Sequence, residues 1–423
     1  MSSVVIRGGV RLKGKVRVSG SKNAALPILA ATAMMEGETV LSNVPHLTDI
    51  VTMIRLLRAL NLKAEQRGDR VGIRSNGGIK HMAPYELITK MRASFFVAGP
   101  ILAKNGYAKI PLPGGCAIGS RPVGIHLKGF EALGADITIE HGFVEIKGKK
   151  LKGNKVILEF PSVGATENIM MAATLAKGET VIENAAQEPE IESLAHFLNK
   201  AGAWIEGAGT DEIHIQGADR LEGIQHSIVS DRIEAGTLMI AAAITKGDVE
   251  FEGIVVDHLE FVIDKLQSIG VKVEDKGDGI IRVSGNGNYR SVDLKTSPYP
   301  GFPTDMQAQF MALLSLSQGT SIISEMIFEN RFMHASELGR MGADITIKDH
   351  NAIVKGVRKL SGAPVIAPDL RAGAALWLAA LAADGVSHVS GNEHVERGYE
   401  DFAKKLRSLG ARIERVKETV ESA

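Results

Sequence analysis

The sequence predicts an α/β protein of two domains, each built from three similar repeats. Three recurring features carry this prediction: a turn before strand-like runs, a glycine after apolar helical stretches, and a hairpin. A chain of 423 residues exceeds the usual size of one hydrophobic core, so length alone also favours two domains. Within each domain we expect buried helices surrounded by sheets and amphipathic helices.

The first recurring feature is a small-residue turn before a β-like run. It reads LGADI at residues 133–137 and MGADI at residues 341–345. Its central positions recur every 68 to 73 residues, at Asn61, Gly134, Gly202, Gly270, Gly342 and Gly410. Self-similarity at a nearly constant interval indicates repeated structural units, here six.

The second feature is a glycine that ends an apolar helical stretch and supplies its left-handed cap. The six glycines are Gly37, Gly106, Gly178, Gly247, Gly319 and Gly385. The helices expected before them are apolar on nearly every side, which indicates burial: 24–35, 93–103, 168–176, 235–244, 306–316 and 372–383. The stretches 50–60 and 402–409 instead place Arg or Lys among Leu and Ile at helical spacing, as outer amphipathic helices do.

The third feature is a hairpin, in which alternating apolar residues end at a glycine. IHIQG at 213–217 leads to LEG at 221–223, and the same pattern opens the chain at 4–8 and 12–14. The sixth unit, near Val416, lacks this hairpin, so residues 1–21 are expected to complete it. The predicted domains are therefore 22–229 and 1–21 plus 230–423, with the active site in the cleft between them. An open solenoid is the alternative, which the matching termini disfavour.

Composition limits the classes of partner. Formal net charge is zero, so no basic field indicates nucleic acid binding. The single cysteine cannot form an internal disulfide, as in proteins of a reducing compartment. The N-terminus lacks the pattern of a signal peptide, and no apolar run reaches the ~20 residues that span a bilayer. We expect a cytoplasmic protein with no nucleic acid or membrane partner, and the oligomeric state stays open.

Cations stand at or beside the expected starts of helices. A helix N-terminus carries partial positive charge, so a cation there is unfavourable by about 0.3–1 kcal/mol. The cations are Lys22, Arg92, Arg121, Arg232, Arg331, Arg371 and Arg397. Some could reach back to a carboxylate, but seven in a neutral protein favour a heavily anionic ligand.

Two carboxylates stand at the same kind of position. In FPTDMQ at 302–307, Thr304 is an adequate helix cap, and Asp305 could merely compensate the helix dipole. Asp369 could likewise be an ordinary helix-capping residue. A carboxylate among arginines stays ionised, however, and becomes a usable base if a substrate hydroxyl is held against it.

Cys116 lies in the glycine- and proline-rich loop LPGGCAIGSRP at 112–122, five residues before Arg121. Nearby positive charge stabilises a thiolate, so this is a candidate reactive thiol, and a chance surface cysteine is the alternative. No P-loop, dinucleotide fingerprint or zinc spacing is present, so we expect neither a cofactor nor a metal. Four of the histidines are expected at the surface or at caps: His46, His126, His258 and His334.

These residues together resemble the UDP-N-acetylglucosamine 1-carboxyvinyltransferases, a family of enolpyruvyl transferases. The likeness covers essentially the whole chain through SKNA at 21–24, LPGGC at 112–116, RP at 121–122, SVGAT at 162–166, DR at 231–232, FPTDMQ at 302–307, ENRF at 329–332, DLR at 369–371 and RGY at 397–399. It implies an inside-out α/β barrel of six subdomains in two domains. It also implies transfer of the enolpyruvyl group of phosphoenolpyruvate to the 3′-hydroxyl of UDP-N-acetylglucosamine, with release of phosphate, at the start of peptidoglycan precursor synthesis.

The resemblance also implies roles for residues. Cys116 corresponds to the family's proton donor, which also forms a covalent adduct with phosphoenolpyruvate and is the target of fosfomycin; which role is productive stays open. Asp305 corresponds to the base for the sugar hydroxyl, while Lys22, Arg121 and Arg397 hold phosphate and carboxylate. Further residues line or support the substrate sites: Asn23, Arg92, Pro122, Val123, Gly124, Ile125, Ser162, Val163, Gly164, Arg232, Ile327, Arg331, Asp369 and Arg371. The family commonly carries an acidic residue where this chain has Gly124, which leaves the detail of uridine binding open.

Two alternative hypotheses about the function remain. The shikimate-pathway enolpyruvyl transferase shares the fold and phosphoenolpyruvate but lacks the cysteine loop and takes a smaller acceptor. A non-catalytic, anion-binding paralogue is the other. The presence of Lys22, Cys116, Asp305 and Arg397 together disfavours it.

Overall fold

The computed structural model describes residues 2–75, 78–112 and 123–417. These form two compact units. The described residues between 20 and 229 make the first unit, and residues 2–19 and 230–417 make the second. No helix in the described ranges is long and apolar enough to cross a membrane.

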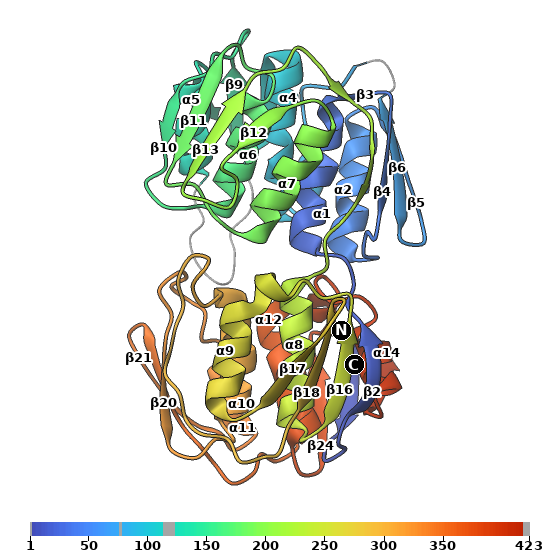
Figure 1. Ribbon diagram of the computed structural model, residues 1–423, viewed down its shortest axis with the longest axis vertical. Coiled ribbons are helices and arrows are strands. Elements are labelled where there is room, and N and C mark those ends of the chain that lie inside the picture. Colours follow the sequence, from blue (N-terminus) through green and yellow to red (C-terminus); the bar gives the residue numbers. More distant parts are fainter. Residues whose placement is uncertain (1, 76–77, 113–122, 418–423) are drawn as a thin grey trace, which may run out of the picture. The chain divides into compact units, whose positions relative to one another are not determined.

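The first unit contains three buried helical segments, surrounded by sheets and outer helices (Figure 1). Its helices are α1 (Lys22–Ala31), η1 (Thr32–Met34), α2 (Thr48–Ala59), α3 (Tyr85–Ile88), η2 (Arg92–Val97), α4 (Ala98–Asn105), α5 (Gly124–Ala132), α6 (Val163–Ala173) and α7 (Pro189–Lys200). Its strands are β3 (Met35–Glu36), β4 (Glu38–Ser42), β5 (Leu62–Arg67), β6 (Arg70–Ser75), β7 (Tyr107–Pro111), β8 (Asp136–Glu140), β9 (Phe143–Lys147), β10 (Lys155–Ile157), β11 (Glu179–Glu183), β12 (Trp204–Glu206), β13 (Glu212–Gln216), β14 (Leu221–Glu222) and β15 (Gln225–Ser227).

The second unit repeats this plan. Its helices are α8 (Arg232–Ile244), η3 (Val256–Leu259), α9 (Glu260–Ile269), η4 (Thr304–Met306), α10 (Gln307–Leu314), α11 (His334–Arg340), α12 (Leu370–Ala382), α13 (Asn392–Val395) and α14 (Phe402–Ser408). Its strands are β1 (Ser2–Arg7), β2 (Lys13–Arg17), β16 (Asp248–Glu252), β17 (Lys272–Gly277), β18 (Ile280–Ser284), β19 (Leu294–Lys295), β20 (Thr320–Ser324), β21 (Asp344–Lys348), β22 (Asn351–Lys355), β23 (Pro364–Ile366), β24 (Val386–Ser390) and β25 (Arg412–Lys417).

The helices at the centre of each unit are buried on all sides, as their apolar sequences predict. Every residue of α10 is buried, and so is every residue of α6 after its first two. In the second unit α8, α10 and α12 pack against one another, and in the first unit α4 packs against α6. The starts of these helices carry most of the predicted site residues.

Five of the sheets in the described residues include a strand from the preceding repeat. Three strands pair antiparallel, and a fourth strand from the repeat before joins in parallel: β15 with β4 and β10 with β11 in the first unit, and β2 with β16, β19 with β20 and β23 with β24 in the second. The sheet of β7, β9 and β8 has only a single parallel bridge in that place, from Met82 to Lys109. In each unit the last repeat gives its parallel strand to the sheet of the first repeat: β15 pairs with β4, and β2 pairs with β16. The three repeats of each unit therefore close into a ring.

The N-terminal segment completes the sixth repeat, as the sequence predicts. β1 lies between β24 and β25, with Val4 opposite both Val389 and Arg415. The first and last described strands, β1 and β25, therefore lie side by side in the second unit. β2 then joins β16 in the fourth repeat, where Val16 stands opposite Phe251.

In five repeats a backbone hydrogen bond joins the glycine of the hairpin to the glycine that follows the buried helix. The backbone N–H of the hairpin glycine donates to the carbonyl of the glycine after the buried helix, at 2.9–3.0 Å. The pairs, donor first, are Gly8 with Gly385, Gly148 with Gly106, Gly217 with Gly178, Gly285 with Gly247, and Gly356 with Gly319. Gly8 in this series is direct evidence that the N-terminal hairpin belongs to the sixth repeat.

The expectation that these glycines cap the buried helices is wrong in most repeats. Only Gly106 caps a buried helix directly, at φ 68°, whereas Gly178 stands five residues beyond the end of α6. In the fourth repeat the left-handed residue is Lys246, at φ 54°, and not Gly247. Gly247 is needed for space instead, because a Cβ there would collide with the carbonyl oxygen of Leu12.

We predict that Gly217→Ala destabilises the first unit, because the added methyl would meet the carbonyl oxygen of Ala176. Overpacking of this kind lowers the free energy of unfolding by about 1–3 kcal/mol. Gly72→Ala is the matched control, since nothing lies within 4 Å of its Cβ position and neither glycine has a positive φ. Denaturant unfolding of both variants measures the difference, and equal stabilities would contradict the proposed close approach.

Candidate active site

Asp305 is the centre of the charged cluster in the second unit. It lies in η4, immediately before the buried helix α10. Its Oδ1 accepts a hydrogen bond from Nη2 of Arg331 at 2.8 Å, and its Oδ2 accepts from Nε and Nη2 of Arg371 at 3.1 and 2.9 Å. Both arginine side chains are nearly buried, at 4% and 5% exposed, while the Asp305 side chain is 28% exposed. One carboxylate thus forms ion pairs with two of the seven predicted cations.

The charges decide the protonation state of this carboxylate. Burial alone would raise the pKa of Asp305, but the charges and hydrogen bonds of Arg371 and Arg331 outweigh it and hold the pKa well below its usual range. The group is therefore ionised at neutral pH. The Nη1 atoms of Arg331 and Arg371 are buried and have no hydrogen-bond partner among the described residues.

The start of α12 fixes Arg371. Asp369 is the N-cap of this helix, and its Oδ1 accepts from the backbone N–H groups of Arg371 and Ala372 at 2.8 and 2.9 Å. The guanidinium lies 5.2 Å from the centre of the Tyr399 ring. Gly398 allows the loop beside Tyr399 to approach α12, because a Cβ there would collide with Leu370. The predicted role of Asp369 as a helix cap is confirmed. This cap fixes the start of α12, from which Arg371 reaches Asp305.

The expectation that Thr304 caps its helix is wrong. Its hydroxyl donates instead to Oε2 of Glu325 at 2.8 Å. Glu325 is only 1% exposed, and it also accepts from the backbone N–H of Ile327 at 2.9 Å. Sequence reasoning missed Glu325, since a single glutamate after a strand carries no local signal.

Lys22 and Asn23 open α1 in the first unit. Ser21 is the N-cap, and its Oγ accepts from the backbone N–H of Ala24 at 3.2 Å. The Nζ of Lys22 lies 3.3 Å from Oδ2 of Asp49 in the first turn of α2, and both side chains are nearly buried. Lys22 is therefore a third predicted cation that is paired with a carboxylate of the protein.

Arg92 begins the 3₁₀ segment η2 and not an α-helix. Asn168 of α6 forms hydrogen bonds to the segment that follows Arg92. Its side-chain amide donates to the carbonyl of Phe95 at 3.0 Å and accepts from the N–H of Gly99 at 2.8 Å. The same amide nitrogen lies 3.1 Å from Nδ1 of His126. Burial of the ring, together with the charge of Arg92, lowers the pKa of His126, so that the ring is neutral at neutral pH.

Ser162, Val163 and Gly164 form the start of α6. Ser162 is its N-cap, with Oγ accepting from the N–H of Ala165 at 3.4 Å. Val163 and Gly164 are half-buried, and a Cβ at position 164 would lie 3.3 Å from the His126 ring. The backbone N–H groups of a helix start are suited to an anion.

The other predicted binding residues of the second unit also lie at helix starts or in loops. Arg232 follows the N-cap Asp231 of α8, and its guanidinium lies 5.5 Å from the centre of the Tyr299 ring. Ile327 is half-buried in the loop after β20. Arg397 is half-buried in the loop after α13, where its N–H donates to the carbonyl of His394 at 3.3 Å.

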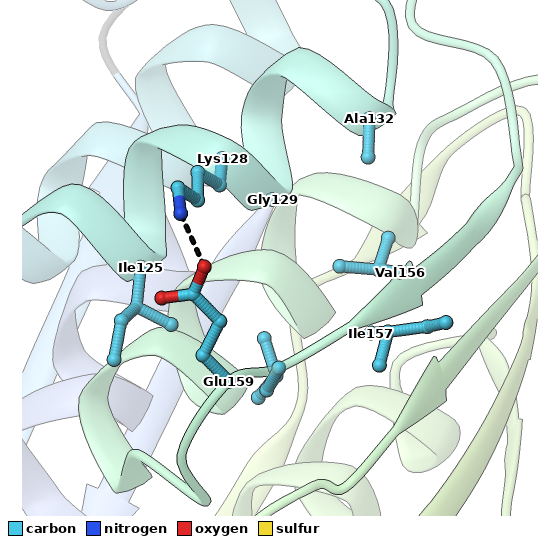
Figure 2. A pocket seen from close by; sticks show the side chains of 8 residues that line it. Ile125, Lys128, Gly129, Ala132, Val156, Ile157 and Glu159 are labelled. Atoms are coloured by element: carbon cyan, nitrogen blue, oxygen red, sulfur yellow. Dashed lines mark hydrogen bonds and ion pairs between the residues drawn. The ribbon is translucent and has the colours of Figure 1, made fainter.

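Three predicted residues, Cys116, Arg121 and Pro122, lie outside the described residues. Val123 and Gly124 stand at the start of α5, and Ile125 follows them in its first turn. Ile125 also borders a small pocket between α5 and β10, where Lys128 forms an ion pair with Glu159 (Figure 2). The pocket holds about 80 Å³, far below the roughly 300–1,000 Å³ of typical ligand sites. It has no evident place in the substrate chemistry.

The expectation that His334 lies at the surface or a cap is wrong. It is fully buried at the start of α11, and neither ring nitrogen has a hydrogen-bond partner among the described residues. Burial lowers its pKa to about 4, with Arg331 adding to the effect and Asp369 opposing it. A neutral imidazole here adds no charge beside Arg331. In the described ranges no group of three or more His, Cys, Asp or Glu side chains could hold a metal ion.

Comparison with known proteins gives the class of the chain. Residues 6–406 match the family model of EPSP synthase (3-phosphoshikimate 1-carboxyvinyltransferase), and the chain belongs to this family of enolpyruvyl transferases. It is 56% identical over 97% of its length to UDP-N-acetylglucosamine 1-carboxyvinyltransferase 1 of Caldanaerobacter subterraneus subsp. tengcongensis, covering 99% of that protein. It is 55% identical over 99% of its length to UDP-N-acetylglucosamine 1-carboxyvinyltransferase of Geotalea daltonii, covering 100% of it.

Solved structures confirm the predicted inside-out barrel of two domains. The enolpyruvyl transferase NikO from Streptomyces tendae superposes with a TM-score of 0.89 at 24% identity, covering 98% of this chain and 99% of that one. EPSP synthase from Acinetobacter baumannii gives 0.77 at 22% identity, covering 99% and 100%.

We predict that Asp305→Asn lowers the free energy of unfolding of the second unit. Removing one partner of a buried ion pair leaves uncompensated charge and costs about 3–5 kcal/mol. The pKa of Asp305 is lowered by folding, so its stabilisation is complete above the ordinary Asp pKa and is lost as pH falls below it. Denaturant unfolding from pH 7 to pH 2 should therefore show the difference between wild type and variant shrinking below about pH 4.

Asp384→Asn provides the control, because its ion pair with Lys359 is exposed at 70% and 68%. Such pairs contribute about 0–1 kcal/mol. If Asp305→Asn were no more destabilising than Asp384→Asn, the charge cluster would not be a stabilising element.

Proposed function

We propose that this chain transfers the enolpyruvyl group of phosphoenolpyruvate to the 3′-hydroxyl of UDP-N-acetylglucosamine and releases phosphate. The observation that supports this most is full-length identity of 54–56% to several relatives named UDP-N-acetylglucosamine 1-carboxyvinyltransferase. The chain also has the motifs that sequence reasoning tied to this reaction, from SKNA at 21–24 to RGY at 397–399. The reaction provides a precursor of peptidoglycan, and we place it in the cytoplasm.

The reaction proceeds by addition and then elimination. In the addition, the 3′-oxygen bonds to C2 of phosphoenolpyruvate, its proton passes to a base, and an acid protonates the C3 methylene to a methyl group. In the elimination, a proton leaves that methyl group, the double bond returns, and the bond from C2 to the phosphate oxygen breaks. No redox change occurs, and the proton lost from the methyl group balances the one that the acid gave to C3.

Asp305 is the proposed base for the 3′-hydroxyl. Its carboxylate is ionised because Arg331 and Arg371 hold it, so it is free to accept a proton at neutral pH. A carboxylate with so low a pKa is a weak base, and the transfer is favourable only as the new C–O bond forms and the hydroxyl becomes acidic. The partial exposure of its side chain, at 28%, leaves it accessible to a substrate hydroxyl.

Cys116 is the proposed acid toward C3, or the nucleophile that forms an adduct with phosphoenolpyruvate. Lys22, Arg121 and Arg397 are proposed to hold the phosphate and carboxylate groups. The helix starts that carry Asn23, Arg92, Ser162 to Gly164 and Arg232 are proposed to bind the nucleotide sugar, since helix N-termini present N–H groups to anions. No cofactor or metal takes part in this proposal.

Phosphate release measured with each acceptor tests the proposal. With phosphoenolpyruvate present, we expect release with UDP-N-acetylglucosamine and none with shikimate 3-phosphate. Cys116→Ser should lose about 10²–10⁴-fold in kcat if the thiol is the acid, the usual contribution of general acid catalysis. Activity with shikimate 3-phosphate alone would favour the shikimate-pathway reading, and no release with either acceptor would favour the non-catalytic paralogue.

Fosfomycin labelling tests the reactivity of the thiol separately. The resemblance implies that the epoxide alkylates Cys116, so intact-mass measurement should show one adduct per chain when UDP-N-acetylglucosamine is present. Cys116→Ser should show none, which makes it the control for labelling elsewhere. An unlabelled wild-type chain would count against a reactive thiol at this position.

A further inference from the structure

Glu325 joins the two segments that carry the Asp305–Arg331 pair. It follows directly after β20, and its side chain is 1% exposed. Its Oε2 accepts a hydrogen bond at 2.8 Å from the hydroxyl of Thr304. Thr304 immediately precedes Asp305 in the sequence. Its Oε1 accepts from the N–H groups of Ile327 and Phe328, at 2.9 and 3.2 Å, in the loop that leads to Arg331.

Two further hydrogen bonds hold Glu325 in place. Oε1 also accepts from the hydroxyl of Thr296 at 2.9 Å, and the N–H of Glu325 donates to the carbonyl of His350 at 2.8 Å. Thr296 follows β19, whose parallel pairing with β20 sets the two strand ends side by side. Burying a carboxylate is costly unless hydrogen bonds satisfy it, and here hydroxyl and backbone donors occupy both oxygens.

This arrangement connects a fixed strand end to the proposed chemistry. Thr304 and Asp305 are consecutive in η4, so the hydroxyl bond sets where that short turn begins. The loop bonds set the path from Ile327 toward Arg331, whose guanidinium lies 5.2 Å from the centre of the Phe328 ring. The relative placement of carboxylate and guanidinium thus depends on one buried side chain that touches neither.

We propose that Glu325 is a positioning residue, which acts through Thr304 to hold Asp305 in the geometry for proton transfer and through Ile327 and Phe328 to hold the loop before Arg331. The proposal rests on the proposed function in treating Asp305 as the base. A misplacement of about 1 Å in a reacting group can lower a rate about 100-fold. The effect of losing this support should therefore appear in kcat.

Thr304→Val isolates the link to Asp305, because valine has nearly the same shape but no hydroxyl. We expect kcat for phosphate release to fall about 10- to 100-fold, with KM for UDP-N-acetylglucosamine changed less than threefold. Thr304→Ser restores the hydroxyl and should recover most of the rate. Thr174→Val is the matched control, since Thr174 is also buried and loses a hydroxyl that donates to the carbonyl of Met170 at 2.8 Å, with no bond to Glu325 or to the loop before Arg331. Its kcat should stay within threefold of wild type.

A crystal structure of Thr304→Val provides a readout that does not depend on turnover. We expect the Asp305 carboxylate to lose at least one of its hydrogen bonds to Arg331 and Arg371. Unchanged bonds in that structure would overturn the positioning role, as would equal losses of kcat in Thr304→Val and Thr174→Val. If the wild type were inactive with both acceptors, the proposed function would fail, and the structure would still decide whether Glu325 positions Asp305.

Discussion

The parallel strand that each repeat lends to the next is the constraint on which both units depend. A three-stranded antiparallel sheet leaves unpaired backbone groups along its edges, and a strand from another repeat can pair with one of those edges. Among the described residues, five sheets have a short parallel strand from the preceding repeat at that edge, the sheet of β7, β9 and β8 has a single bridge there, and β14 and β3 form a separate two-stranded sheet. The exchange forces three repeats into a ring, which leaves a central space that only small, apolar helices can fill.

The position of the charges follows from that ring. The buried helices are mostly apolar along their length, and the starts of α1, α6, α8 and α12 carry capping residues and charges of the predicted site. Asp369 and Asp231 are helix caps there. Asp305 forms ion pairs with Arg331 and Arg371. A family that binds anionic substrates can build its site from these ends without disturbing the apolar centre.

Sequence reasoning predicted the six repeats, the buried helices and the use of residues 1–21 in the sixth repeat, because periodic apolar patterns and recurrent glycines are local features. It did not predict that Gly8 and Gly385 share a hydrogen bond, nor that Lys246 rather than Gly247 takes the left-handed turn. It identified Asp305 and both arginines but not their pairing. Glu325 and the burial of His334 could not be found, since each depends on which distant segments the fold brings together.

The place of β1 between β24 and β25 has a consequence for how the chain is made. On a ribosome the N-terminal strand emerges first, yet the strands that flank it emerge last. The first unit is continuous in sequence and can fold as soon as residue 229 has left the ribosome, since domains generally fold as units during synthesis. In the second unit β1 stays without its sheet partners until β24 and β25 have been made, so this unit completes its sheet after the first unit has been synthesised.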